Sequence, residues 1–279
     1  MKRTESVHAF NGNLKTYVYS TEADRTKAVV LLVHGLGEHA RRYDEQLEFF
    51  GNNGYACLAA DLPGHGRSEG KRGVWLHVEE HYKVIDGLFN WSKSTYPDLP
   101  IILYGHSMGG NLAAGYVTDR NPVISGLMLT GSAIKTPKDM PLFMVNTVLK
   151  APHVIQNITI ANGLNLKSLC NDPEIVDKYI HDPLVHDRIS LGGGATILAN
   201  AAKIMSIPFS PPYPILIMHG ENDTITYPKG SSDLASRWKG NITLKIWPGM
   251  LHEIHNEPGK LMVWEEMIKW MEDNIRNKS

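Results

Sequence analysis

Cysteine and net charge are both scarce in this sequence. Only two cysteines occur among 279 residues, and Cys57 lies in the apolar run YACLAAD, which is typical of a small core side chain rather than half of a disulfide. The 28 basic and 29 acidic residues give a formal charge of −1, so no whole-protein field attracts nucleic acid or an anionic membrane surface. We therefore expect no nucleic-acid partner and an uncharged or zwitterionic substrate.

The sequence also lacks a long hydrophobic run near its start. Two basic residues, Lys2 and Arg3, are followed by TESVHAFNGNLK. This segment has no apolar stretch of the length that a signal peptide or a membrane span needs. Together with the scarcity of cysteine, this pattern predicts a cytoplasmic protein.

What the sequence does contain is an alternation of strand-like and helix-like segments. Hydrophobic residues make up 42% of the chain, enough for a sizeable core. Helical periodicity around 43–51, 81–89 and 108–119 separates short runs rich in β-formers. These runs are AVVLLVHG (28–35), YACLAAD (55–61), IILYG (101–105), ISGLMLTG (124–131), PILIMHG (214–220) and ITLKIWPG (242–249). With Asn11-Gly12 as a hairpin turn, the order predicts an α/β fold: a mostly parallel, doubly wound sheet that opens with an antiparallel hairpin.

An insertion interrupts this alternation at about 132–210. Roughly eighty residues separate Gly131 from the next clear strand, far more than a normal βα connection. The segment MPLFMVNTVLKAPHVI is apolar, so we expect a helical cap that either adds packing or, as we favour, forms a lid over an acyl pocket. The glycine run LGGGAT (191–196) lacks the Lys-Ser/Thr of a phosphate-binding loop and is predicted to be a turn in the cap. The simplest division is one domain, 1–279, with this cap inserted.

The segment GHSMG (105–109) places Ser107 between a predicted strand and a predicted helix. This is the context that a G-x-S-x-G nucleophile elbow requires. A sharp turn strains the serine backbone, and glycines on both sides avoid a Cβ against neighbouring chain. We predict that Ser107 is the nucleophile of a hydrolytic enzyme.

A serine nucleophile needs a base and an acid that orients the base. On folds of this kind the chain order is Ser, then Asp or Glu, then His. Asp223 and His252 follow the last two predicted strands, at the edge where open α/β sheets carry their sites. We therefore predict Asp223 as the acid and His252 as the base.

Hydrolysis of an acyl group also needs two backbone N–H groups at the developing oxyanion. One is expected from Met108, directly after the nucleophile. The other is expected from Leu36, whose flanking glycines in HGLGEH let its amide turn inward. His34 in the same loop is interpreted as a hydrogen-bonding brace.

Several motifs together resemble the monoacylglycerol lipase and lysophospholipase branch of the α/β hydrolases. They are HGLGEHARRY, DLPGHGRSEG, GHSMGG, DPLVHD, HGENDTIT and GMLHEIH, and they span nearly the whole chain. The resemblance implies that the first histidine of the final pair, His252, is the base. It also implies that Glu38, Arg42 and His255 contact the glycerol end of the substrate, with bracing of the loop by salt bridges as the alternative.

The resemblance implies a serine esterase that acts on a small lipid ester, monoacylglycerol first, with lysophospholipase or general carboxylesterase as alternatives. A serine peptidase is disfavoured because the apolar cap has no obvious acidic cluster for a peptide amine. A non-catalytic ligand-binding protein on the same scaffold would be expected to lack a triad member, and all three are present. No cofactor is expected because water completes both half-reactions.

Two further expectations concern metals and partners. His252 and His255 are three residues apart after a strand, whereas the H-E-x-x-H zinc motif needs four on one helical face, so no metal is predicted. The apolar cap is expected to touch a membrane transiently. The sequence leaves the oligomeric state open.

Overall fold

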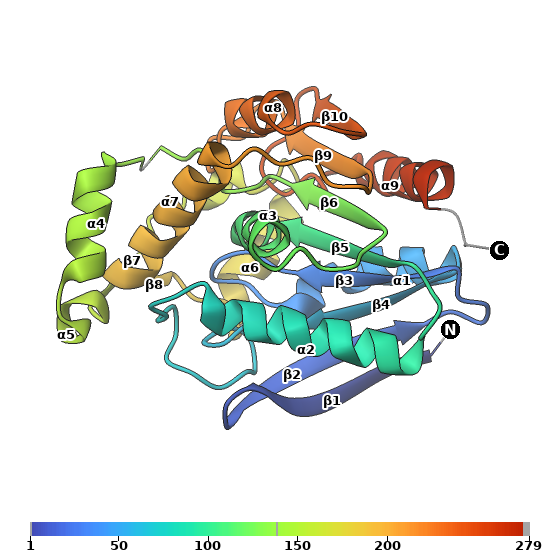
Figure 1. Ribbon diagram of the computed structural model, residues 1–279, viewed down its shortest axis with the longest axis horizontal. Helices are drawn as coiled ribbons and strands as arrows, with labels where there is room; N and C mark the ends of the chain where they lie inside the picture. Colours follow the sequence, from blue (N-terminus) through green and yellow to red (C-terminus); the bar gives the residue numbers. More distant parts are fainter. Residues whose placement is uncertain (1, 138, 276–279) are drawn as a thin grey trace.

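The computed structural model describes residues 2–137 and 139–275, which form an eight-stranded sheet in the order β1-β2-β4-β3-β5-β6-β9-β10 (Figure 1). The strands are β1 (Lys2–Asn11), β2 (Leu14–Glu22), β3 (Ala28–Val33), β4 (Tyr55–Ala60), β5 (Ile101–His106), β6 (Gly126–Thr130), β9 (Ile215–Gly220) and β10 (Ile242–Trp247). Strand β2 is antiparallel to both β1 and β4, and the remaining neighbours are parallel. The predicted fold, a mostly parallel sheet that opens with a hairpin at Asn11-Gly12, is therefore confirmed.

Helices cover both faces of this sheet, which explains why β3, β4, β5, β6 and β9 are buried along their whole length. One face packs against η1 (Ala40–Tyr43), α1 (Asp44–Asn52) and α9 (Lys260–Asn274). The other packs against α2 (Glu79–Thr95), α3 (Met108–Arg120) and α8 (Pro228–Arg237). The two apolar clusters lie on opposite sides of the sheet, so its strands are held rigidly between them.

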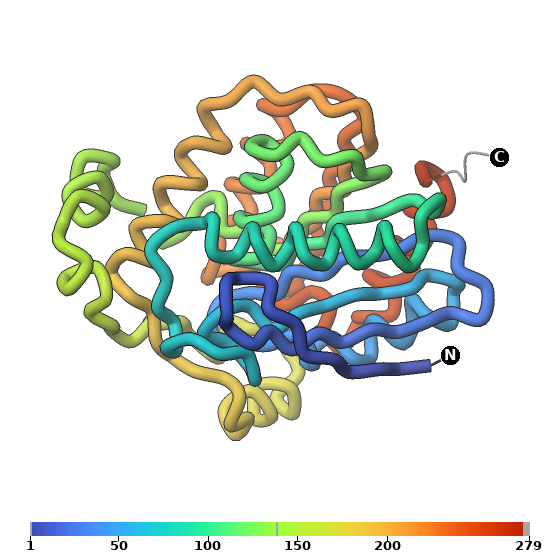
Figure 2. The backbone as a smooth tube through the Cα atoms, turned by 60° about the horizontal axis from the view of Figure 1, so that its bottom comes forward, coloured from blue at the N-terminus to red at the C-terminus, as the bar shows by residue number. Residues whose placement is uncertain are grey.

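The segment between β6 and β9 contains several short elements. They are α4 (Leu142–Lys150), α5 (His153–Gln156), β7 (Thr159–Ala161), η2 (Leu166–Ser168), α6 (Pro173–His181), β8 (Arg188–Ser190) and α7 (Leu191–Ser206). Figures 1 and 2 show α4 and α5 on the side of the molecule opposite to the start of β1 and the end of α9. Helix α7 packs against both α3 and α4, while β7 and β8 form a separate antiparallel pair. No helix in the described part of the chain is both long and apolar enough to cross a bilayer.

The prediction of a turn at LGGGAT (191–196) is wrong, because these residues begin helix α7. Ser190 caps the helix by accepting a hydrogen bond from the Gly193 amide at 3.0 Å. A Cβ at Gly193 would lie 2.8 Å from the Trp75 ring, and one at Gly192 would lie 3.0 Å from Gln156. The glycines therefore allow the helix to pack closely against its neighbours, which outweighs their low helix propensity.

Candidate active site

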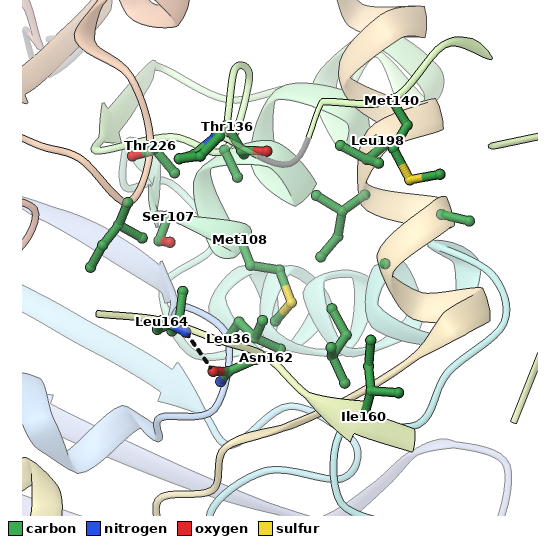
Figure 3. Close-up of a pocket in the computed structure, with 18 of the residues that line it drawn as sticks. Leu36, Ser107, Met108, Thr136, Met140, Ile160, Asn162, Leu164, Leu198 and Thr226 are labelled. Carbon is green, nitrogen blue, oxygen red and sulfur yellow. Dashed lines mark hydrogen bonds between the residues drawn. The ribbon is translucent and has the colours of Figure 1, made fainter. Parts of the chain in front are cut away.

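Ser107 lies at the turn between β5 and α3, with φ at +55° and ψ at −118°. A positive φ is strained for a residue that carries a Cβ. The turn is so tight that a Cβ at Gly105 would lie 2.3 Å from the carbonyl oxygen of Gly109, and one at Gly109 would lie 2.0 Å from that of Val33. The motif GHSMG therefore folds as a strand, a sharp turn and a helix, and Ser107 lines a cavity there (Figure 3).

Asp223 and His252 form a hydrogen-bonded pair. The two residues follow β9 and β10, which are parallel neighbours, so their loops meet at the same edge of the sheet. His252 Nδ1 donates to Asp223 Oδ2 at 2.7 Å, and both side chains are buried. In the neutral ring the other nitrogen of His252, Nε2, then carries no proton and can accept one.

Electrostatics favour an ionised Asp223 beside a basic His252. Burial on its own would raise the pKa of Asp223, but His252 and a hydrogen bond from His219 outweigh it and hold that pKa well below its usual range. Burial also disfavours a charged His252, yet the Asp223 carboxylate raises the pKa of His252 above its ordinary value. The pair is therefore suited to accept a proton.

Residues that are near both Ser107 and His252 show that Ser107 lies near the pair of Asp223 and His252. Its amide donates to the Thr130 carbonyl at 2.9 Å, and a Cβ on the next residue, Gly131, would lie 3.3 Å from His252 Cε1. Thr226, whose hydroxyl is 3.2 Å from His252 Nδ1, lines the same cavity as Ser107. No side chain in residues 2–137 or 139–275 hydrogen-bonds to Ser107 Oγ, and catalytic hydrogen bonds often tighten only when substrate binds.

The two expected oxyanion donors, Leu36 and Met108, both line the cavity beside Ser107 (Figure 3). Within the described ranges neither of their amides donates a hydrogen bond to the protein. Met108 is the first residue of α3, where helical N–H groups have no partner in the helix. The loop of Leu36 comes close because Gly35 has no Cβ, which would lie 3.1 Å from Ser107 Cβ.

Glu38 and Arg42 form a buried ionic network that does not line the cavity. Arg42 donates to Glu38 Oε2 at 2.6 Å and to both carboxylate oxygens of Glu253 at 2.6 and 2.8 Å. Glu38 Oε1 accepts from the Gly35 amide at 2.6 Å and from the Tyr43 hydroxyl at 2.7 Å. Both carboxylate oxygens of Glu38 are thus engaged within the protein, and Oε1 binds the Gly35 amide in the loop that carries Leu36.

His255 also lies outside the cavity lining and is buried against Tyr43 and His106. Neither of its ring nitrogens has a hydrogen-bond partner among the described residues. Burial lowers the pKa of His255 to about 3. Within the same ranges, no group of three His, Cys, Asp or Glu side chains is arranged to hold a metal ion.

The cavity at Ser107 has a volume of about 490 Å³ and a largely apolar lining. Figure 3 shows Ser107 at one end, Met108 beside it, and Met140, Leu198 and Ile160 further along. None of the described lining residues is charged. The volume and lining fit a small ligand with an extended apolar part.

Two residues of the site were missed by sequence reasoning, His219 and Thr226. His219 Nε2 and Thr226 Oγ1 each donate to Asp223 Oδ2 at 2.8 Å. Both belong to the motif HGENDTIT that contains Asp223. The available signal was a polar residue, His219, near the carboxyl end of an otherwise apolar strand.

Comparison with known proteins identifies the family. Residues 24–259, most of the chain, match the family described as serine aminopeptidase, S33. The chain belongs to this family. A monoacylglycerol lipase of Mycolicibacterium smegmatis is 30% identical over 285 residues, which cover 98% of this chain and 99% of that protein. The resemblance to this branch of the α/β hydrolases is therefore confirmed.

A solved structure and a second relative are also similar to this S33 chain. The crystal structure of a Paleococcus ferrophilus monoacylglycerol lipase has 33% identity and a TM-score of 0.81, and the match covers 91% of this chain and 98% of that one. An uncharacterized abhydrolase domain-containing protein of Dictyostelium discoideum is 31% identical over 255 residues. The match covers 90% of this S33 chain but spans only 27% of the Dictyostelium protein.

Proposed function

We propose that this protein hydrolyses the ester bond of monoacylglycerols to fatty acid and glycerol through an acyl-enzyme intermediate. The observation that carries the proposal is the hydrogen-bonded pair of Asp223 and His252 close to Ser107. Ser107 itself lines an uncharged and largely apolar cavity. The monoacylglycerol lipases among the similar proteins support the same class of ester hydrolase.

In the proposed mechanism His252 Nε2 takes the hydroxyl proton of Ser107 as Oγ attacks the ester carbonyl carbon. The N–H groups of Leu36 and Met108 donate to the resulting oxyanion. His252 then gives the proton to the departing glycerol oxygen, leaving the acyl group on Ser107. A water molecule, deprotonated by His252, then attacks the acyl carbon, and His252 returns the proton to Ser107 Oγ as the bond between Oγ and the acyl carbon breaks and the fatty acid leaves. Asp223 holds His252 in the tautomer that keeps Nε2 free.

The apolar end of the cavity is the proposed acyl site. Residues from the segment between β6 and β9, including Met140, Ile160 and Leu198, form much of its wall. Each substrate methylene buried there would contribute roughly 0.8 kcal/mol. We therefore propose that 1–279 works as one α/β-hydrolase domain and that the insertion at about 132–210 is its lid.

Cleavage of peptides is disfavoured on the same grounds. An aminopeptidase must hold a charged α-amino group, which needs a carboxylate partner in a buried site. The described lining of the cavity has no Asp or Glu side chain. An ester with a neutral alcohol suits this lining better than a peptide.

The lid also presents apolar side chains to solvent, and we propose that they contact membranes transiently. Phe143 in α4 is 71% exposed and Val154 in α5 is 75% exposed, with Leu142 and Ile158 nearby in the chain. Apolar surface of this kind often marks such contacts. With both cysteines buried and unpaired, we propose a cytoplasmic enzyme that visits the membrane surface for its substrate.

The decisive experiment is a kcat/KM panel over monoacylglycerols, lysophosphatidylcholine, triacylglycerol, p-nitrophenyl esters of increasing chain length and an amino-acid p-nitroanilide. Medium-chain monoacylglycerols should be hydrolysed faster than acetyl esters, and triacylglycerol and the anilide should be hydrolysed poorly. Ser107→Ala should be inactive throughout. A flat profile, or a preference for acetyl esters or triacylglycerol, would contradict the lid and its lipid role.

The membrane proposal has its own control. Phe143→Asp and Val154→Asp should reduce co-flotation with phosphatidylcholine vesicles while activity on a soluble ester is kept. Val123→Asp changes an equally exposed valine, 79% accessible, just before β6 and outside the insert. Equal loss of flotation in all three variants would argue against a specific docking surface.

A further inference from the structure

His219 is a second buried histidine that donates to the same carboxylate oxygen as His252. Its Nε2 lies 2.8 Å from Asp223 Oδ2, and the corresponding distance from His252 Nδ1 is 2.7 Å. The side chains of His219 and Asp223 are wholly buried. The carboxylate that orients the proposed base is thus itself held by a second imidazole.

The hydrogen bonds at both ring nitrogens fix the tautomer of His219. An ionised carboxylate only accepts, so Nε2 must carry the proton that faces Asp223. Nδ1 of a neutral ring is then an acceptor, and the hydroxyl of buried Ser231 in α8 lies 2.8 Å from it. The Thr226 carbonyl, 3.0 Å from Nε2, accepts from the same N–H. This arrangement keeps the donor of His219 aimed at Asp223.

His219 also ties a loop residue to the rigid sheet. Asp223 lies in the loop after β9, whereas His219 lies within β9, between its parallel neighbours β6 and β10. The other oxygen, Oδ1, accepts from the amides of Ile225 and Thr226 at 2.8 and 3.0 Å, both in the same loop. His219 is therefore the contact that anchors this carboxylate to the strand.

We propose that His219 is a positioning residue of the hydrolytic reaction, which fixes Asp223 so that His252 presents Nε2 to Ser107. This role rests on the triad of the proposed function, but it does not depend on which ester is the substrate. His219 acts through Asp223 and does not touch the substrate, since it lies outside the cavity lining.

The test measures how fast a fluorophosphonate probe labels Ser107, and how kcat and KM for p-nitrophenyl butyrate vary with pH. His219→Leu removes the donor, and we expect labelling and kcat to fall about 10- to 100-fold, as for outer partners of metal ligands. KM should stay within about twofold because the cavity is untouched. His219→Gln keeps an N–H near the position of Nε2 and should restore most of the rate.

The pH profile separates positioning from a merely structural role. With one donor fewer, Asp223 Oδ2 attracts the His252 proton more strongly, so the acid-side inflection of kcat/KM should move to higher pH in His219→Leu. The other titratable groups near His252, namely His106, His255, Glu38 and Glu253, are the same in every variant. Loss of rate with an unmoved inflection, equal in His219→Leu and His219→Gln, would overturn the proposal.

A milder variant covers the case in which His219→Leu fails to fold. Ser231→Ala removes the donor to His219 Nδ1, and should lower the labelling rate in the same direction by a smaller factor. Ser236→Ala, at an exposed serine of the same helix, is the matched control and should leave the rate unchanged. Wild-type rates in Ser231→Ala and His219→Leu would contradict the proposal. Wild-type protein that is labelled at Ser107 but hydrolyses no monoacylglycerol would instead remove only the proposed substrate.

Discussion

His255 stacks face to face on Tyr43, with ring centroids 4.5 Å apart and 15° between the ring planes. The stack encloses His255 so fully that charging its ring is unfavourable, and burial lowers its pKa to about 3. His252, by contrast, has a carboxylate on Nδ1 and a raised pKa. The two histidines of one short motif are therefore in opposite electrostatic environments.

From this contrast we expect His252→Ala to lower kcat by about 10⁴- to 10⁶-fold, as loss of a catalytic base does. His255→Phe preserves an aromatic ring on Tyr43 and should keep kcat within about tenfold. Steady-state kinetics on p-nitrophenyl butyrate compares the two variants. A larger loss at His255 than at His252 would reverse the assignment of the base.

Ser107→Ala is expected to abolish ester hydrolysis and leave the fold intact. Loss of a triad nucleophile costs about a million-fold in rate, and the substitution removes a single oxygen. Activity and thermal unfolding should be measured on the same preparation. Retention of more than about a hundredth of wild-type activity would mean that Ser107 is not the nucleophile.

Arg42 and its neighbour Arg41 provide a test of the buried ionic network. Arg42→Ala leaves the carboxylates of Glu38 and Glu253 buried without their partner, which should lower the free energy of unfolding by about 3–5 kcal/mol. Arg41 is half-exposed and pairs with Asp44 on the surface, so Arg41→Ala should change the free energy of unfolding by less than about 1 kcal/mol. Urea unfolding measures both values.

The same variants decide between bracing and substrate contact. If Arg42 acted only on the glycerol end of the substrate, Arg42→Ala would raise KM for monoacylglycerol and leave the unfolding free energy unchanged. Bracing predicts lost stability together with slower labelling of Ser107, because Arg42 holds Glu38, and Glu38 in turn accepts from the Gly35 amide in the loop that carries Leu36.

Buried neutral histidines should make the protein sensitive to acid. Burial lowers the pKa of His34 to about 4 and that of His81 to about 3, whereas an unfolded histidine titrates near about 6.5. Below pH 6.5 the unfolded chain therefore binds protons that the folded chain does not. The contribution of these two histidines to stability is fully present above about pH 6.5 and is lost as the pH falls toward their folded-state pKa values of about 4 and 3.

His81→Phe tests this prediction directly. Among the residues that the structure describes, neither ring nitrogen of buried His81 has a hydrogen-bond partner, and the ring packs on Trp75, so phenylalanine should be accommodated. The variant should melt near the wild-type temperature at pH 7.5 and be more stable than wild type by about 2 kcal/mol at pH 5. His77→Gln, at an exposed histidine, is the control and should melt like wild type at both pH values. An equal response of both variants to acid would exclude His81 as a source of the sensitivity.

The central parallel strands could be predicted from the sequence because they are mostly apolar runs with a glycine close by. The expected strand at 101–105, for example, is Ile101–His106 in the structure. Helix α7 could not be predicted at its start, because LGGGAT has poor intrinsic helix propensity. Gly193 packs against Trp75 and Gly192 packs against Gln156, two residues that are close in space but distant in the sequence, and these contacts explain why glycine is needed at both positions.

The site shows the same division. Ser107, Asp223 and His252 were predicted from motif and chain order, and their roles remain predictions until the variants are measured. Salt-bridge bracing was an alternative for Glu38 and Arg42, which are four residues apart, but the second carboxylate of the network, Glu253, could not be derived because it is 211 residues from Arg42 in the chain. Pairing over such a separation depends on the folded topology and leaves no local pattern.

The strained backbone of Ser107 has a consequence for how this sequence can drift over generations. Glycine would adopt the positive φ without a Cβ penalty, and strain of this kind costs of order 1–3 kcal/mol. A protein with no use for the Ser107 hydroxyl could relieve this strain by a single change to glycine. The strained serine therefore points to the hydroxyl itself, which lines the cavity, as the group that this position exists to supply.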